Sequence, residues 1–375
     1  MSYDTLRLIW WALLGVLLIG FAVMDGFDLG TAALLPFVAH NDVERRIAIN
    51  TVGPVWEGNQ VWFILGGGAI FAAWPALYAA SFSGFYLAMF LVLATLILRP
   101  VGFKFRSKLD APAWRSLWDW CLFSGGVVPP LVFGVAFGNL FRGVPFGFDG
   151  DLRFHPDISL LSLLNPFALL VGAVSLAMIV LHGAAWLNLK TEGDVRMRAR
   201  GVMPFAALAF VVLFTAAGVW VSRMDGYRII GTLVANAPSN PMTKTVATES
   251  GAWFANAAAD PWLWLAATVA YMGAILAAAL RNRPGFAFLA SALVPAGTIT
   301  TAGTALFPFL LPSSSHPGAS LTVWDASSSK LTLAVMLGAV AIFLPPVLAY
   351  TAWAYRVMRG PVRERDIAEN TKSAY

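Results

Sequence analysis

Long apolar tracts alternate with short polar connections along the whole chain. An apolar tract of about 20 residues is long enough to cross the hydrocarbon core of a bilayer as a helix. Nine tracts are long enough, and we place them at 7–36, 53–77, 82–103, 118–141, 163–189, 202–222, 261–281, 285–311 and 330–357. The pattern predicts an all-α polytopic membrane protein with about nine transmembrane helices.

Composition strengthens this interpretation and excludes several others. Of the 375 residues, 58% are hydrophobic and only 12% are charged, whereas soluble domains carry about 25% charged residues. The longest polar connection, 223–260, is too short for a core of its own, so residues 1–375 are expected to form a single integral membrane domain. The single cysteine, Cys121, excludes an internal disulfide and argues against a cysteine-held metal or iron–sulfur site. We expect no metal site in this chain.

The distribution of basic residues predicts the orientation in the membrane. Cytoplasmic loops of membrane proteins are enriched in Lys and Arg, and here every second connection is basic. The first tract lacks a basic stretch and a cleavage signal, so we interpret it as a retained helix. The N-terminus and the 223–260 loop are then periplasmic, and the C-terminus is cytoplasmic. Because topology explains the net charge of +5, we expect no nucleic-acid partner. The basic loop residues are Arg45, Arg46, Lys104, Arg106, Lys108, Arg115, Lys190, Arg196, Arg198, Arg200, Arg281 and Arg283.

Three carboxylates lie within the first two apolar tracts. Asp25 and Asp28 belong to the motif M-D-G-F-D-L-G, and Glu57 belongs to V-W-E-G-N-Q-V-W together with the amides of Asn59 and Gln60. An ionisable group at membrane depth costs about 2.5–3.5 kcal/mol on insertion scales, so such groups usually have a partner or a function. The predicted orientation places all three carboxylates in the cytoplasmic half of the membrane.

This arrangement suggests a proton relay in which the neighbouring amides orient water molecules. The alternative is a structural polar cluster that holds the first two helices together, or that caps a kink at Gly26 or Gly58. A proton-coupled transporter would also carry carboxylates near the membrane midplane. The residues alone leave these alternatives open.

One of the four histidines, His182 in V-L-H-G-A-A-W, lies inside an apolar tract. A membrane-buried histidine is a candidate haem ligand. However, no second histidine or methionine is suitably placed for a haem with two axial ligands. We therefore favour a hydrogen-bonded interior histidine.

Several motifs together resemble subunit II of the cytochrome bd-type quinol oxidases, over nearly the whole chain. Each piece is weakly specific alone, but their number and order carry the resemblance. The matching stretches are I-W-W-A-L-L-G-V-L-L-I-G-F-A-V-M-D-G-F-D-L-G from Ile9, G-N-Q-V-W-F-I-L-G-G-G-A-I-F-A-A-W-P from Gly58, F-S-G-F-Y at 82–86, R-P-V-G-F at 99–103, G-V-A-F-G-N-L at 134–140, L-N-P-F at 164–167, S-N-P at 239–241, L-T-V-W-D-A-S-S-S-K-L-T-L at 321–333 and Y-T-A-W at 350–353.

The resemblance implies a fold and a set of partners. It implies two four-helix bundles with a peripheral helix, in a heterodimer with a larger subunit I in the bacterial inner membrane. Subunit I holds two haems b and one haem d, and this chain is expected to ligate none of them. The oxidase couples quinol oxidation to the reduction of dioxygen to water and generates a proton gradient. The resemblance also allows a structural ubiquinone, of which His182 would then be a neighbour, as well as bound lipids and a small single-helix accessory subunit.

The resemblance further implies roles for individual residues. Asp25 and Glu57 would carry protons from the cytoplasm, with Asp28, Asn59 and Gln60 beside them. The family often has an aspartate at the position of Glu57. Trp62 would flank a route for dioxygen, with ordinary packing at the subunit interface as the alternative. A subunit that serves only as a scaffold is the remaining alternative.

Overall fold

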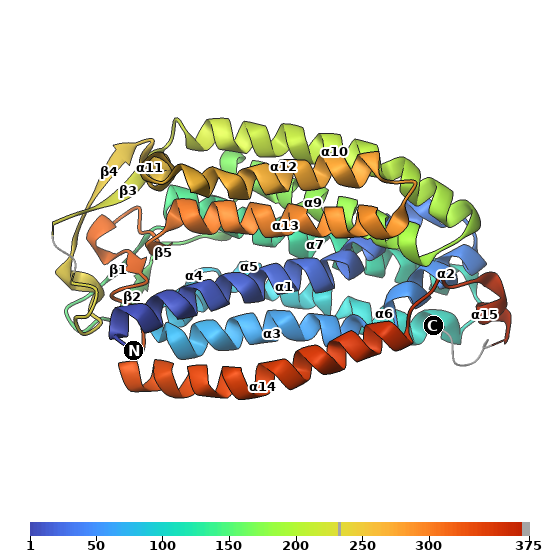
Figure 1. Ribbon diagram of the computed structural model, residues 1–375, viewed down its shortest axis with the longest axis horizontal. Helices are drawn as coiled ribbons and strands as arrows, with labels where there is room; N and C mark the ends of the chain where they lie inside the picture. The colour runs from blue at the N-terminus through green and yellow to red at the C-terminus, as the bar shows by residue number, and fades with distance from the viewer. Residues whose placement is uncertain (232–233, 370–375) are drawn as a thin grey trace.

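The structure is a computed structural model that describes residues 1–231 and 234–369 of the chain. Its long helices run side by side along one axis (Figure 1). They are α1 (Tyr3–Val38), α3 (Trp56–Ala73), α7 (Pro112–Arg142), α9 (Pro166–Lys190), α10 (Gly193–Val221), α12 (Trp264–Ala279), α13 (Pro284–Leu306) and α14 (Lys330–Val357). One further pass is divided into α4 (Pro75–Gly84), α5 (Tyr86–Leu96) and α6 (Leu98–Phe105).

The prediction of an all-α membrane protein is confirmed. In the described residues, eight helical segments are long and apolar enough to cross a membrane. The helix of the predicted tract 53–77, α3, is not among them because polar residues at its start lower its mean hydropathy. It nevertheless runs alongside α1 (Figure 1). The predicted tract 82–103 is not one continuous helix, since the pass breaks at Phe85 and again at Ile97.

The helices form two groups of four with one helix outside them. The first group contains α1, α3, α5 and α7, and the second contains α9, α10, α12 and α13. The last long helix, α14, packs against α1 and α3, and Leu333 is its one fully buried residue. This arrangement agrees with the expected pair of four-helix bundles and a peripheral helix.

Glycines allow α1 to approach both α7 and α9 closely. A Cβ atom at Gly30 of α1 would overlap the backbone of α9 at Gly183, and a Cβ atom at Gly126 of α7 would overlap the backbone of α1. Small residues at such crossings let helix backbones touch, which is the main source of packing between helices in lipid. As a result, the segment of α1 from Asp25 to Leu35 is buried on all sides.

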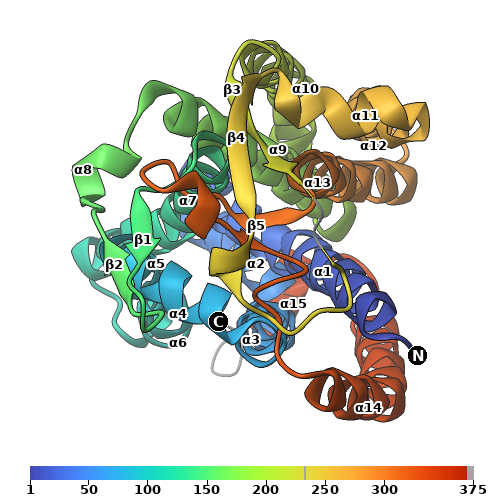
Figure 2. The same ribbon diagram turned by 90° about the vertical axis from the view of Figure 1, so that its left-hand side faces the viewer.

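The two ends of the bundle differ in structure. One end carries three antiparallel hairpins (Figure 2), and the other carries α2 (Asp42–Val52) and α15 (Glu364–Glu369). The strands are β1 (Phe146–Phe148), β2 (Phe154–Pro156), β3 (Asp225–Ile230), β4 (Thr245–Ser250), β5 (Phe309–Leu311) and β6 (Leu321–Thr322). The short helices are α8 (Leu160–Leu163), α11 (Ala255–Ala259), η1 (Arg106–Lys108), η2 (Pro241–Thr243), η3 (Ala252–Phe254), η4 (Pro261–Leu263) and η5 (Pro317–Ala319).

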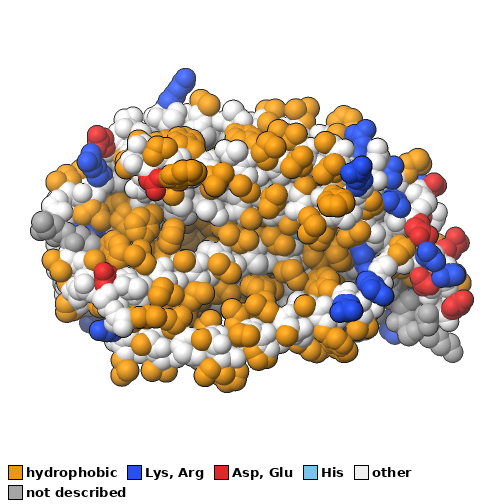
Figure 3. Space-filling model, viewed as in Figure 1, with side chains coloured by type: hydrophobic (Ala, Val, Ile, Leu, Met, Phe, Trp, Pro, Cys, Tyr) orange, Lys and Arg blue, Asp and Glu red, His pale blue; other side chains and the backbone are white. Residues whose placement is uncertain are grey.

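Charge also distinguishes the two ends. Lys and Arg side chains gather at the end that carries α2 and α15, while the flank between the ends is largely hydrophobic (Figure 3). The N-terminus lies at the hairpin end, and α15, the last helix described, lies at the basic end (Figure 1). We refer below to the basic end and the hairpin end. The 223–260 connection contains β3 and β4 and lies at the hairpin end.

Candidate functional site

A cluster of three charged side chains lies inside the first helix group. Asp25 and Asp28 are one turn apart on α1, and both are fully buried. The guanidinium of Arg99, from α6, donates to both oxygens of Asp25, with Nη2 to Oδ1 at 2.8 Å and Nη1 to Oδ2 at 3.0 Å. Its Nη2 also lies 4.0 Å from Oδ2 of Asp28. The single guanidinium of Arg99 therefore lies close to the carboxyl groups of both Asp25 and Asp28.

The position of Arg99 depends on its neighbours on α7. A Cβ atom at Gly125 would lie 2.8 Å from Cγ of Arg99, so the glycine leaves the space through which the side chain passes. The break at Ile97 begins a new short helix, α6, two residues before Arg99. The planar guanidinium suits a paired contact with a carboxylate better than an ammonium group does. These features place a cation where α1 presents its acidic side chains.

Two polar side chains extend the cluster toward the outside of the bundle. Nδ2 of Asn59, on α3, donates to Oδ2 of Asp28 at 2.8 Å. The hydroxyl of Tyr355, on α14, donates to Oδ1 of Asn59 at 2.5 Å. Asp25, Arg99, Asp28, Asn59 and Tyr355 thus form one continuous series of polar contacts. We call these five residues the polar path.

The charges of the polar path do not balance. Two carboxyl groups face one guanidinium, and Oδ1 of Asp28 is buried without a hydrogen-bond partner in the described residues. An uncompensated charge inside a protein is strongly destabilising. One proton bound at the carboxyl pair would bring the cluster to neutrality. The arrangement can therefore bind and release a proton, which a fully matched ion pair cannot do without breaking.

Comparison with known proteins identifies the family. The model of the cytochrome bd terminal oxidase subunit II family matches residues 6–358. The chain belongs to this family. It is 54% identical over its full length to the probable cytochrome oxidase subunit 2 of Haemophilus influenzae, with all of that protein covered. It is 50% identical to the cytochrome bd-I ubiquinol oxidase subunit 2 of Escherichia coli, again with both chains fully covered.

More distant relatives agree over nearly the same length. The cytochrome bd ubiquinol oxidase subunit 2 of Bacillus subtilis is 34% identical, with 96% of this chain and 97% of that protein covered. A chain of the bd oxidase from Geobacillus thermodenitrificans has the same fold, with a TM-score of 0.68 at 15% identity. That match covers 94% of this chain and 98% of the other chain. The resemblance found in the sequence motifs is therefore confirmed.

Glu57 does not join the polar path in this subunit II chain. Its side chain is exposed, and within the described residues it has no hydrogen-bond or ion-pair partner. Glu57 and Asn59 are two positions apart, so they point to nearly opposite sides of α3. Gln60 is partly exposed and makes no hydrogen bond in the described residues. In the isolated chain, Glu57 and Gln60 therefore lie outside the polar path, and their role in proton transfer stays a prediction.

Trp62 packs against α1 in the same helix pair. A Cβ atom at Gly20 would overlap its indole ring, so the glycine provides the surface on which the ring rests. Trp62 is partly exposed on this chain. Its position fits both interpretations given above, since a partly exposed ring can border a passage or an interface.

His182 is a hydrogen-bonded interior residue. Its Nδ1 lies 2.8 Å from Oγ of Ser291, and its Nε2 lies 2.8 Å from the carbonyl oxygen of Val23. The ring stacks on Phe288. Both nitrogens are occupied, so neither is presented to an axial position of a haem. In the described part of the chain, no group of three or more His, Cys, Asp and Glu residues could hold a metal ion.

Two members of the polar path did not emerge as candidates from the sequence. Arg99 is a charged residue within the apolar tract 82–103, which is the same signal that drew attention to Asp25. Tyr355 gives no such signal, because tyrosines near the ends of transmembrane helices are common as interfacial anchors. Only the hydrogen bond from Tyr355 to Asn59 shows that Tyr355 belongs to the polar path.

Proposed function

We propose that this subunit II carries protons along its polar path toward the oxygen-reducing site of a haem-bearing subunit I. The oxidase of this family oxidises quinol and reduces dioxygen to water, and this chain is a multi-pass membrane subunit of such an enzyme. Reduction of dioxygen to water consumes one proton for every electron. A subunit that holds no reaction centre contributes to this chemistry by delivering those protons.

The observation that carries the proposal is the unbalanced carboxyl pair at the centre of an unbroken series of contacts. Asp28 contacts Asn59 at 2.8 Å and Arg99 at 4.0 Å, and Arg99 holds Asp25. A site that shares one cation between two acids can exchange a proton while its geometry is kept. The roles are then distinct. Asp28 holds the proton, Asn59 and Tyr355 orient the path, and Arg99 fixes Asp25.

The basic end supports an orientation in which the path draws protons from the cytoplasm. The gathering of Lys and Arg at that end agrees with the positive-inside rule. We accordingly place the N-terminus and the 223–260 loop in the periplasm and the C-terminus in the cytoplasm of a bacterial inner membrane. Uptake on the cytoplasmic side, with quinol protons released outside, builds a proton gradient.

Glu57 and Trp62 keep roles that depend on a partner chain. Glu57 lies at the first turn of α3 and faces away from the polar path. We propose that it exchanges protons at the contact with subunit I, together with Gln60. Trp62 would border the route for dioxygen toward haem d of that subunit. A bound ubiquinone and a single-helix accessory subunit stay proposals that follow from the family, without residues assigned to them.

The test is substitution of Asp28 by Asn in the assembled oxidase, reconstituted into vesicles. The amide keeps the hydrogen bonds but cannot release a proton, so quinol-driven oxygen consumption should fall about a hundredfold, within the range that proton-transfer groups contribute. Proton uptake from the side of the basic end should fall with it. The matched control is Asp260→Asn, in an exposed connection at the hairpin end, which should leave both rates unchanged.

The outcome decides between the relay and a scaffold. If Asp28→Asn assembles with its haems and consumes oxygen at the wild-type rate, the cluster is only structural. The haem spectrum of the purified complex shows that assembly is intact, so a loss of rate cannot be mistaken for a loss of subunit I.

A further inference from the structure

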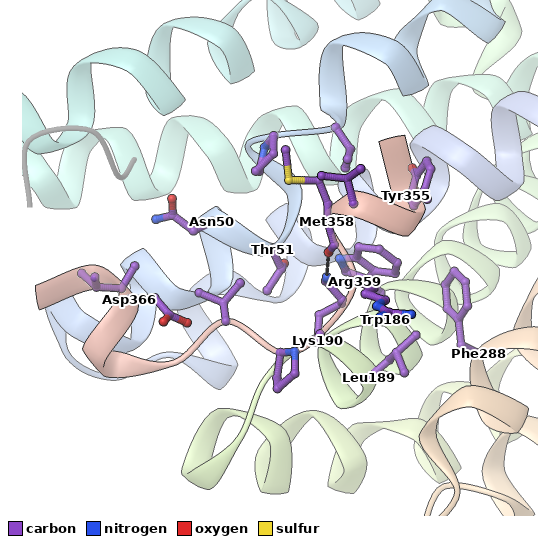
Figure 4. Close-up of a pocket in the computed structure, with 17 residues that line it drawn as sticks. Asn50, Thr51, Trp186, Leu189, Lys190, Phe288, Tyr355, Met358, Arg359 and Asp366 are labelled. Atoms are coloured by element: carbon purple, nitrogen blue, oxygen red, sulfur yellow. Dashed lines mark hydrogen bonds between the residues drawn. The ribbon is translucent and has the colours of Figure 1, made fainter. Parts of the chain in front are cut away.

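A cavity of about 890 Å³ lies at the basic end of the molecule (Figure 4). Its walls come from α2, α9, α13, α14, α15 and the segment that joins α14 to α15. That segment crosses back over the end of α9, where the backbone N–H of Val362 donates to the carbonyl oxygen of Lys190 at 2.8 Å. The cavity therefore sits where helices of the membrane region end and the C-terminal segment covers them.

One wall of the cavity is apolar and aromatic. Trp186, Phe288 and Tyr355 line it together with Leu189 and Val55. Phe288 and Trp186 lie with ring centroids 5.2 Å apart, so this side is a firm surface of packed rings. The hydroxyl of Tyr355 is engaged by Asn59, which leaves the ring to line the cavity. Such a wall suits a hydrocarbon chain and would be poorly wetted if the cavity held only water.

The polar part of the lining carries an excess of positive charge. Nζ of Lys190 donates to the carbonyl oxygen of Met358 at 2.6 Å, which uses one of its three donors. Arg359 is exposed and has no hydrogen-bond or ion-pair partner in the described residues. The carboxyl group of Asp366 also lines the cavity, but it accepts the backbone N–H of Arg363. Two cations thus face one carboxylate that already has a partner.

A third donor lacks a partner beside the two cations. The indole Nε1 of Trp186 is buried and has no hydrogen-bond acceptor in the described residues. Trp186 is 96% buried, with 4% of its surface exposed, and buried polar groups without partners are rare in folded proteins. Lys190 lies 5.6 Å from the centre of the same ring. Trp186 therefore contributes its ring to the wall of the cavity, while Lys190 and Arg359 supply the spare donors that line the space.

We propose that this cavity binds an anionic phospholipid. Its phosphate lies between Lys190 and Arg359, and the first part of an acyl chain packs against Trp186 and Phe288. The site is at the level of the basic residues, where lipid headgroups meet the ends of transmembrane helices. A free phosphate ion would leave the aromatic wall uncovered. A quinone, whose head carries no charge, would leave both cations unmatched. The proposal does not depend on proton transfer.

The experiment measures which lipid stays with the purified oxidase. The complex is stripped of loosely held lipid, exchanged into nanodiscs of dioleoylphosphatidylglycerol or dioleoylphosphatidylcholine, and examined by native mass spectrometry. The wild type should retain phosphatidylglycerol in preference to phosphatidylcholine. Arg359→Gln should lower this retention about fivefold, the factor expected for one basic residue near an anionic headgroup. The matched control is Arg356→Gln, which removes an exposed cation from the same helix end but does not line the cavity.

Several results would overturn the proposal. Equal retention of the two lipids would show that the headgroup is not recognised, and equal losses in Arg356→Gln and Arg359→Gln would show only diffuse attraction. Full retention in Arg359→Gln, displacement of the lipid by inorganic phosphate alone, or recovery of ubiquinone from the site would also contradict it.

A second measurement covers the case in which the Arg359 variant does not assemble. Phosphatidylglycerol with a photoreactive diazirine near its headgroup is applied to the wild-type complex. Crosslinks should fall on peptides that contain Trp186 or Met358, and their absence from both would exclude the site.

Discussion

Two of the clusters of acidic and basic side chains in the described residues are built differently. The polar path holds Asp25 and Asp28 against one guanidinium, deep inside the first helix group. The cluster at the basic end holds Asp42, Asp110 and Asp119 against three guanidinium groups. Its contacts are Arg45 to Asp119 at 2.7 Å, Arg106 to Asp119 and to Asp42 at 2.5 and 3.0 Å, and Arg115 to Asp42 and Asp110 at 2.9 and 2.6 Å.

The difference lies in the balance of charges. At the basic end three acids meet three bases, so each carboxylate is matched and the cluster joins α2, η1 and α7 into one surface. In the polar path an acid is left over. A matched network is suited to holding elements together, whereas a surplus acid provides a group that can gain and lose a proton. Burial alone does not separate the two, because Arg106 and Asp119 are buried as well.

The largest effect is expected from Arg99→Gln. It leaves Asp25 and Asp28 buried without a cation, and breaking such a pair costs about 3–5 kcal/mol. The matched variant Arg115→Gln removes a partly exposed base that shares Asp42 with Arg106, and should cost less than about 1 kcal/mol. Thermal unfolding of the purified complexes compares them. Equal losses of stability in the two variants would mean that the two clusters contribute equally to the stability of the fold.

A smaller effect is expected from Asp119→Asn at the basic end. Hydrogen bonds to charged groups contribute about 1.5–3 kcal/mol, and this change weakens the contacts of Asp119 with both Arg45 and Arg106. Stability should fall, while oxygen consumption per assembled complex stays at the wild-type level. Asp28→Asn should give the reverse pattern. A loss of proton uptake in Asp119→Asn at unchanged haem content would contradict this division between the clusters.

The smallest effect is expected from Tyr355→Phe at the outer end of the polar path. It removes one hydrogen bond to Asn59, and a typical bond contributes about 0.5–1.5 kcal/mol. Oxygen consumption should fall only a few-fold, because Asp28 and Asn59 remain. The isosteric control is Tyr271→Phe, which removes a hydroxyl contact with Thr215 in the second helix group. If both variants behave alike, Tyr355 is not part of the path.

The number and order of the membrane passes could be predicted from the sequence, because crossing a bilayer demands apolar length. The breaks at Phe85 and Ile97 could not. The residues from Ser81 to Leu98 are almost uniformly apolar, so nothing in the hydrophobic pattern marks where one helix stops and the next begins. The segments between the breaks pack against different neighbours, α4 against α3 and α5 and α6 against α7, and such packing is a property of the assembled fold.

The acidic members of the site could be predicted better than their surroundings. Asp25, Asp28 and Asn59 stood out because polar groups are rare at this depth. The sequence did not show that Asn59 is buried while Glu57 is exposed. The apolar residues of α3 are spread over all of its sides, so their pattern does not indicate which side faces α1. The role of Tyr355 could not be predicted either, because its hydrogen-bond partner, Asn59, lies 296 positions earlier in the chain.

The long separation in sequence between Asn59 and Tyr355 determines the order in which the residues of the polar path come together. Chains are synthesised from the N-terminus, and early segments fold before late ones emerge. When α14 leaves the ribosome, the helices that carry Asp25, Asp28, Arg99 and Asn59 have already been made. Tyr355 therefore joins the path after its other members, from a helix that packs mainly against α1 and α3. A nascent subunit that stops short of α14 holds its acids but lacks the outermost donor, so the path is completed only once α14 has been made.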